Sequence, residues 1–448
     1  MSGALGGHGG SGRPGGPDPR REPFRRYLSA WIGFSAGGQF SQALAVAIVL
    51  YAFSAHAVRG LIGWPGSIAV LASLVVLAAF SLVGARHRIE WHGILPVSLL
   101  ALFGLMALSV LWSRYTWISV GGVAYAVGFG ALGLYLALGR DLVQVVRATG
   151  DGLRILLVTS LALEVLSGIL VDQPFPFLGI QGNLALGGPI QGLPGTRNAL
   201  GFLAALAAVT FAVEYLTRSV PRPVAGTSLA LAAVTLVFAS SPTTAVAVLV
   251  LAVAGLALSA LRRAPTGRRP AIQVVLGAFV VAGLALAWFG RRRLLDALGA
   301  GGDVATRTTL WDRMRGLISV HEIQGWGFVG QWPTDVFPFV VLTSPSGRPH
   351  ETGLNAWYDV WLQLGLAGLL VLVAAGTLAF VRSWAIASGH PIVAYVWPAL
   401  VLLLVGVVSF AESFVLTEGT LMLFVACATF AARKRSWRTR LPAATARR

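Results

Sequence analysis

Apolar residues dominate this chain in long runs that are separated by short polar segments. A membrane-crossing helix needs about 20 mostly apolar residues, and such runs recur from residue 28 to residue 432. The pattern predicts twelve transmembrane helices, near 28–53, 62–84, 94–112, 117–138, 155–171, 198–216, 227–240, 243–261, 271–290, 355–380, 392–410 and 419–432. The seventh and twelfth runs are short, and Ser241-Pro242 could break one longer helical hairpin.

Composition supports an all-α polytopic membrane protein. Of the 448 residues, 56% are apolar and 11% are charged, whereas roughly a quarter of the residues of soluble domains are charged. We expect residues 1–27 to be a disordered cytoplasmic segment, because they are rich in Gly, Pro and Arg. Without an apolar stretch and cleavage site, this segment is not a signal peptide. Residues 433–448 form a basic cytoplasmic tail.

The distribution of basic residues predicts the orientation of the chain. With a cytoplasmic N-terminus and alternating segments, 24 of the 34 basic residues lie inside and ten lie outside. Both termini are then cytoplasmic, and a large loop, 291–354, lies outside between the ninth and tenth helices. We expect a multi-pass protein of the cytoplasmic membrane. The net charge of +17 therefore indicates membrane lipids as partners, not nucleic acid.

Two arginines are candidates for binding a phosphate group. Arg197 ends the Gly- and Pro-rich segment 172–198 and stands where an apolar helix begins, so its guanidinium could grip a pyrophosphate beside a helix N-terminus. The alternative is an arginine that extends to lipid headgroups. Arg307 precedes Trp311 by four residues, so in a helix the indole could brace the guanidinium. Arg315 would then lie on roughly the same side.

The segment around Arg307 has a second interpretation. An amphipathic helix could lie on the membrane surface, with Trp311, Met314 and Leu317 dipping inward. Such a helix is compatible with a site, because it could hold arginines over a substrate headgroup.

A candidate for proton transfer precedes the tenth apolar run. His350 could accept a proton near neutral pH, and Glu351 could orient it or act as the base itself. The alternative is an ordinary loop histidine. Asp359 and Glu164 are carboxylates within apolar runs, which makes them functional candidates. The single Cys427 excludes an intramolecular disulfide, and no Cys and His spacing indicates a metal.

Several motifs occur in an order that resembles the O-antigen ligase and polymerase superfamily, over roughly residues 100–370. They are S-V-L-W-S (109–113), G-L-P-G-T-R-N-A-L-G-F (192–202), A-S-S-P-T-T (239–244), T-R-T-T-L-W (306–311), Q-G-W-G-F (324–328) and N-A-W-Y-D-V-W-L-Q-L-G-L-A-G (355–368).

The resemblance implies a fold like that of type-C glycosyltransferases and the transfer of a glycan from a polyprenyl-pyrophosphate carrier to an acceptor hydroxyl on the outer face. The acceptor is a glycan or a lipid. It assigns Arg197 and Arg307 to the donor pyrophosphate and implies neither a metal nor another cofactor. We take Asn198, Trp311, Arg315, Asn355 and Asp359 as supporting residues of this site.

One position departs from the family pattern. The family helix usually opens with His-Asn, whereas this chain has Leu354 before Asn355. His350 lies one helical turn upstream and reaches the same volume if the helix begins early, so we assign the base to His350, with Glu351 as the fallback. Two alternatives stay open. One is a transporter or flippase of a lipid-linked glycan, and the other, which the missing histidine permits, is a binder that does not turn it over.

Overall fold

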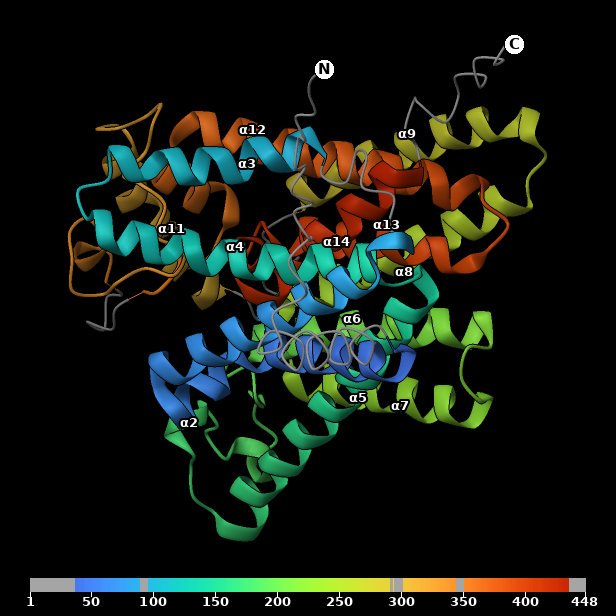
Figure 1. Ribbon diagram of the computed structural model, residues 1–448, viewed down its shortest axis with the longest axis horizontal. Coiled ribbons are helices and arrows are strands. Elements are labelled where there is room, and N and C mark those ends of the chain that lie inside the picture. The colour runs from blue at the N-terminus through green and yellow to red at the C-terminus, as the bar shows by residue number, and fades with distance from the viewer. Residues whose placement is uncertain (1–36, 89–95, 291–292, 294–300, 344–349, 435–448) are drawn as a thin grey trace, which may run out of the picture.

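The computed structural model describes residues 37–88, 96–290, 293, 301–343 and 350–434, which form helices joined by turns and loops (Figure 1). The helices are α2 (Gly38–Gly84), α3 (Val97–Leu108), α4 (Thr116–Gly139), α5 (Leu142–Val165), α6 (Arg197–Thr217), α7 (Arg222–Ala239), α8 (Pro242–Arg263), α9 (Arg269–Phe289), α11 (Gly301–Ile318), α12 (Ala356–Gly389), α13 (Val396–Val408) and α14 (Glu418–Lys434). The expected N-terminal segment 1–27 and residues 435–448 of the tail lie outside the described residues.

The helices are those of an all-α membrane protein. Among the described residues, seven helices are long and apolar enough to cross a membrane, and three shorter apolar helices accompany them. Each of the twelve expected apolar runs lies largely within one of these helices. The first two runs share a single helix, α2. The number of crossings stays a prediction.

Two of the long helices are broken at glycines. The backbone of α2 leaves the helical region at Gly63, where φ is 70°, and Pro65 follows. The backbone of α12 does so at Gly365, where φ is 67°. Because these angles are accessible mainly to glycine, each break is set by the sequence. The break at Gly63 separates the two apolar runs that we expected as separate helices.

Two predicted helix starts were wrong. Helix α5 begins at Leu142 rather than near residue 155, and a π-helical segment, Leu166–Val171, continues it. The polar residues that placed 142–154 in a loop include Arg154, whose charge is paired inside the protein with Glu214. Helix α7 begins at Arg222 rather than near 227. Ser241-Pro242 separates two helices, because Ser240 has a φ of 47° and Ser241 caps α8.

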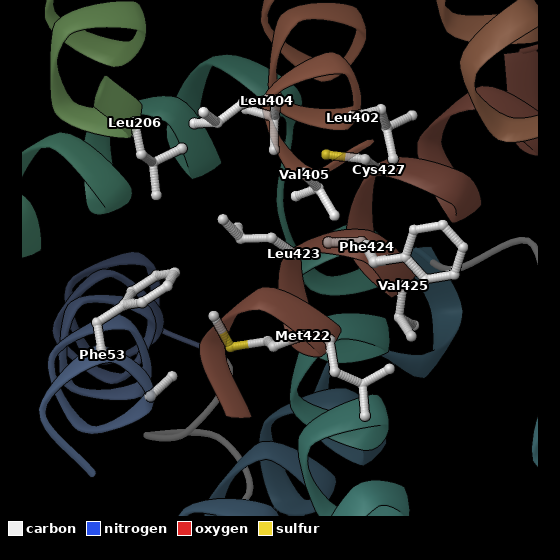
Figure 2. Packing of buried hydrophobic residues seen from close by; sticks show 14 of the residues in the cluster. Phe53, Leu206, Leu402, Leu404, Val405, Met422, Leu423, Phe424, Val425 and Cys427 are labelled. Carbon is white, nitrogen blue, oxygen red and sulfur yellow. The ribbon is translucent and has the colours of Figure 1, made fainter. Parts of the chain in front are cut away.

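Helix α14 lies in the core of the bundle. Every side chain from Leu421 to Ala428 is at most 4% exposed, which is typical of a helix that is covered on all sides. Figure 2 shows its side chains between Phe53 of α2, Leu206 of α6 and Val405 of α13. A Cβ at Gly133 of α4 would overlap the carbonyl oxygen of Met422, so a small residue permits this close helix contact, as in many membrane proteins.

The polar turns gather at one end of the bundle, which we call the loop-rich end. Of the described residues, it contains 60–66, 109–115, 172–198, 301–343, 350–355 and 409–418. The Trp112 indole donates to the Gln324 carbonyl at 3.0 Å, and Asn198 donates to Glu412 at 2.6 Å. In Figure 1, α11 and the α3–α4 turn lie at this end, on the left.

Arginines bind backbone carbonyls at the opposite end. Arg433 donates to Ala137 at 2.8 Å, and Arg262 donates to Ala387 at 3.1 Å and to Pro391 at 2.8 Å. Among the described residues, turns that the sequence assigned to opposite sides therefore lie at opposite ends of the bundle.

Candidate functional site

A cavity of about 200 Å³ opens at the loop-rich end, and we call it the α2–α14 cavity. Its walls come from α2, the first turn of α6, the loop segments around 331 and 351, and the start of α14. Its polar lining residues are His56, Arg59, Thr196, Gln331, Glu351, Thr352, Thr417, Glu418 and Thr420. A cluster of this composition, with a cation, an imidazole and two carboxylates, can bind a polar ligand and move a proton.

Arg59 is the cation of this cavity. Its Nη1 donates to the carboxylate of Glu418 and to the Tyr125 hydroxyl, the latter at 3.0 Å. The guanidinium also lies over the Trp64 ring, 4.8 Å from its centroid, which is favourable for a cation. The arginine is therefore held in a fixed orientation at the wall of the cavity.

His56 owes its place to a glycine of the G-T-R-N motif. Gly195 has a φ of 77°, and a Cβ at this position would overlap the His56 ring. The position therefore requires glycine both for its backbone angle and for the space. The motif thus brings the segment before α6 against α2 and places the imidazole in the cavity.

Glu351 lies in the cavity, whereas His350 does not line it. The Gln331 side chain donates to the Glu351 carboxylate, and the Trp332 backbone donates to the Glu351 carbonyl at 2.8 Å. The His350 backbone donates to Leu342 at 3.3 Å. Partial burial lowers the pKa of His350, and the nearby Arg313 lowers it further. His350 is therefore neutral at neutral pH, which is the form that accepts a proton.

Arg307 is buried and paired. It lies on α11 with 8% exposure, and its Nη2 donates to Glu412 at 2.8 Å while its Nη1 donates to the Ala411 carbonyl. Asn198 donates to the same Glu412 oxygen at 2.6 Å. Segments more than 100 positions apart therefore meet at one carboxylate.

The N-terminus of α6 is part of the same cluster. Helix α6 begins at Arg197, and the Thr196 hydroxyl caps it by accepting from Ala199 at 3.2 Å. Ser241 of the A-S-S-P-T-T motif donates to Asn198 at 2.8 Å. Thr196 and Ala199 line the α2–α14 cavity, whereas Arg197 and Arg307 do not. Arg307 thus comes close to Asn198 through Glu412, and Arg197 precedes Asn198 at the start of α6; the convergence of the two guanidinium groups stays a prediction.

The expected roles of Trp311 and Arg315 were wrong. The Trp311 indole donates to Gly353 at 3.0 Å and stacks on Tyr358, while the Arg307 guanidinium binds Glu412. The Arg315 side chain is 61% exposed and paired with Asp312, because two turns rotate it away from Arg307. The apolar face of α11 packs against protein, with Met314 at 0% exposure, and not against a membrane surface.

Asn355 and Asp359 hold the start of α12. The Asn355 side chain accepts from Trp357 at 2.9 Å and from Tyr358 at 3.1 Å. Asp359 accepts from the Trp332 indole at 2.8 Å and from Gln363 at 2.7 Å. These bonds position the backbone around the site, so the two residues have structural roles here.

The region around Leu354 does not extend α12 toward His350. Helix α12 begins at Ala356, with Asn355 as its cap. Leu354 has a left-handed backbone, with a φ of 48°, and it packs against the apolar cluster around Met314. The helix therefore begins too late for His350 to occupy the volume of a histidine at position 354.

The Q-G-W-G-F motif forms backbone hydrogen bonds with α12 next to its break at Gly365. The Trp326 backbone donates to Leu362, and that of Gly327 donates to Gln363, both at 2.9 Å. The Gln363 amide accepts from Val329 at 2.8 Å and from Gly330 at 3.0 Å, and it donates to the Gly330 carbonyl at 3.0 Å. Two motifs that are distant in sequence are thus one structural unit.

Glu164 fixes the segment before α6. Its carboxylate is fully buried and accepts from the backbones of Gln191 and Gly192, both at 2.7 Å. Its partners are backbone groups, because the irregular segment 172–198 has donors that no helix satisfies.

Sequence reasoning missed Arg59 and Gln363 as site residues, and it took Glu412 and Glu418 only as general candidates among the carboxylates at the ends of apolar runs. Arg59 was counted only as an outer basic residue, although a charge between two apolar runs is a signal for a buried partner. Among the described residues, no group of three His, Cys, Asp or Glu side chains could hold a metal ion. Compared with known proteins, the chain matches no family model and no curated protein.

Proposed function

We propose that this protein transfers a glycan from a polyprenyl-pyrophosphate carrier to an acceptor hydroxyl, in the manner of an O-antigen ligase or polymerase. The observation that carries the proposal is the α2–α14 cavity, which combines Arg59, His56 and Glu351 at one end of an apolar helix bundle. A lipid-linked sugar needs both environments, since its tail lies among lipids and its headgroup needs polar contacts. The proposal includes twelve crossings, a type-C glycosyltransferase fold and an outward-facing loop-rich end.

The donor pyrophosphate is assigned to the region of Arg197 and Arg307. Both arginines are near the first turn of α6, whose N-terminus carries a partial positive charge. Arg307 is paired with Glu412, so a pyrophosphate would share or replace that carboxylate. Positive groups that face the departing pyrophosphate stabilise its growing charge, an effect worth about 3 kcal/mol or more in comparable sites.

The reaction needs one base. The acceptor oxygen forms a bond to the anomeric carbon, the bond from that carbon to the carrier phosphate oxygen breaks, and the acceptor proton passes to the base. Placement favours Glu351, because it lines the cavity. His350 has a lowered pKa and precedes Glu351 in the chain, but it does not line the cavity. Glu351 therefore becomes the first candidate and His350 the second.

Purified protein mixed with a polyprenyl-pyrophosphate glycan and a candidate acceptor tests the proposal. We expect release of the carrier pyrophosphate and extension of the acceptor. Glu351→Gln should lower turnover by roughly 10²- to 10⁴-fold, the usual contribution of a general base. Glu322→Gln, an exposed carboxylate of the same region, is the matched control and should change little. Absence of carrier release by the wild-type protein would reject the enzyme.

A transporter or flippase is the second candidate. The breaks of α2 at Gly63 and of α12 at Gly365 favour it, because discontinuous helices are common in transporters. In proteoliposomes, a transporter would move the intact lipid-linked glycan between leaflets without cleaving it. Binding with neither cleavage nor movement would identify a non-catalytic binder.

A further inference from the structure

The Arg59 guanidinium has more N–H groups than its bonds to Glu418 and Tyr125 use. Its side chain is 13% exposed, and Nη1 is the atom that bonds Glu418 and Tyr125. Among the described residues, both of these bonds are made by the one nitrogen Nη1, and Arg59 lines the cavity. Because a guanidinium offers five N–H groups in a planar fork, Arg59 can bind a second anionic partner from the cavity side.

Two helices begin at the wall of the same cavity. Thr196 and Ala199 belong to the first turn of α6, which has 21 residues, and Glu418 and Gly419 begin α14, which has 17. The free N–H groups and the dipole at a helix N-terminus favour an anion. These two ends add to the charge of Arg59, and Thr352, Thr417 and Thr420 contribute hydroxyl groups to the lining.

Glu418 is the lining carboxylate that binds Arg59 directly. Its negative charge opposes the binding of an anion at this position. Glu418 binds both Arg59 and the Tyr125 hydroxyl, the latter at 3.2 Å, and its side chain is 21% exposed. Its backbone has a φ of 51°, a region that costs a bulky residue about 1 kcal/mol or more. The backbone of Glu418 is therefore strained where its carboxylate binds Arg59, and the residue lines the cavity.

We propose that the α2–α14 cavity binds a phosphate-class anion, and that Glu418 occupies Arg59 until this anion displaces it. Arg59 keeps an anionic partner in both states, which avoids the cost of a buried unpaired charge. A phosphate group matches the site better than a carboxylate, because its several oxygens can accept from a guanidinium, two helix ends and hydroxyl groups at once. The cavity of about 200 Å³ holds more than a water molecule, which takes about 30 Å³ in the liquid.

The identity of the natural anion as a carrier headgroup rests on the proposed function, whereas the binding of an anion in the cavity does not depend on it. A carrier headgroup and a free phosphate compound share this chemistry. The two sources can be separated by comparing inorganic pyrophosphate with polyprenyl pyrophosphate in nanodiscs, using empty nanodiscs as the blank.

Isothermal titration calorimetry of the full-length protein with each probe tests the inference. Glu418→Gln keeps the shape of the side chain and removes its charge, so we expect binding to tighten by roughly tenfold. Arg59→Gln should remove the binding that belongs to the cavity, which Arg197 and Arg307 do not line. Arg59→Lys keeps the charge without the planar fork and should weaken binding. Thermal unfolding of each variant shows whether it is folded, and Arg59→Lys and Glu418→Gln decide the question if Arg59→Gln is not.

A matched control lies at the opposite end of the bundle. Arg154 pairs with Glu214 and lies 4.8 Å from the Phe211 centroid, the same arrangement as Arg59, Glu418 and Trp64. Neither Arg154 nor Glu214 lines the α2–α14 cavity, so Glu214→Gln should leave the affinity unchanged.

Three outcomes overturn the inference: neither probe binds, Glu418→Gln fails to tighten binding, or folded Arg59 variants bind as the wild type does. Binding of inorganic pyrophosphate alone identifies a free phosphate compound, and binding of the lipid alone identifies a carrier headgroup. If binding follows the inference and no carrier is released in the transfer assay, the proposed function fails and the anion site stands. If carrier is released and the Arg59 variants bind as before, the anion site fails and the proposed function stands.

Discussion

At the scale of single residues, position 195 requires glycine for two reasons, its backbone angle and the space beside it. Its φ of 77° lies in the left-handed region, and a Cβ would overlap the His56 ring. Alanine at a positive φ destabilises by about 1 kcal/mol or more, and the overlap adds to this cost. We therefore expect Gly195→Ala to lower the midpoint of thermal unfolding in detergent and to displace His56 from the cavity.

The variant Gly187→Ala separates the cost of the backbone angle from the cost of the overlap with His56. Gly187 lies in the same segment with a φ of 67°, but a Cβ there would meet no atom within 4 Å. Gly187→Ala should thus show the backbone cost alone and lower the midpoint less than Gly195→Ala. The double variant Gly195→Ala, His56→Ala should approach the Gly187→Ala value. Equal effects of the two single variants would show that the His56 contact costs nothing.

His350 gives the loop-rich end a pH dependence. Its pKa in the folded protein is lowered by burial and by Arg313, so in acid the unfolded chain binds the proton more readily. The stabilisation is fully present above about pH 6.5, the ordinary pKa of histidine, and is lost as the pH falls from that value through the folded pKa. We expect His350→Gln to reduce this loss when unfolding is measured between pH 7.5 and pH 5.

Arg313 provides the check on the cause. Arg313→Gln removes the positive charge, so the pKa of His350 should rise and the acid loss should shrink while the imidazole stays in place. An acid loss unchanged in both variants would assign it to other groups.

The sequence identified several residues of the site but not their partners. Arg307 and Asn198 were selected from their motifs, yet the carboxylate that joins them, Glu412, lies more than 100 positions away from either. Asn355 and Asp359 were selected as supporting residues, and they hold the start of α12. A single sequence contains no measure of distance between such positions, so long-range pairs could not be predicted.

At the scale of elements, the loop around Trp326 and the break in α12 depend on Gln363. Its amide oxygen accepts from the backbones of Val329 and Gly330, and its amide nitrogen donates to the Asp359 carboxylate. Gln363→Ala leaves these buried groups without partners, and each such group costs about 1–3 kcal/mol. We expect the variant to be destabilised by roughly 2–4 kcal/mol and the loop to become sensitive to proteases.

Gln324→Ala is the control for this loop. Gln324 is exposed, and its side chain makes a single long contact with His321 at 3.5 Å. The variant should unfold like the wild type and resist proteases equally. If Gln363→Ala behaves in the same way, the loop is held by its backbone bonds to α12 and not by the glutamine amide.

Apolar runs predicted the helices well because the bilayer imposes a length and a composition on each. The start of α5 was missed because Arg147 and Arg154 interrupt its apolar pattern. The helix tolerates Arg154 because Glu214 neutralises it, and that partner lies on α6. The break in α12 was missed because Gly365 resembles the many other glycines of the apolar runs, and only the docked loop distinguishes it.

At the scale of the whole molecule, the alternation of segments predicted which turns lie together. Segments that were assigned to one side meet at the loop-rich end, as the contact of Trp112 with Gln324 shows. The α2–α14 cavity could not be predicted, because its walls come from five parts of the chain whose packing is set by side chains in the core.

The distribution of basic residues predicts the side of the membrane that the loop-rich end faces. This side decides whether a lipid-linked glycan on the outer face can reach the cavity. Ser319 is exposed near the end of α11, and Gly267 is exposed between α8 and α9 at the opposite end. The single native cysteine, Cys427, is buried, so it gives little background. In intact cells, a maleimide that does not cross membranes should label Ser319→Cys, and it should label Gly267→Cys only after permeabilisation. The reverse pattern would place the cavity on the cytoplasmic side, where a transfer reaction on the outer face is impossible.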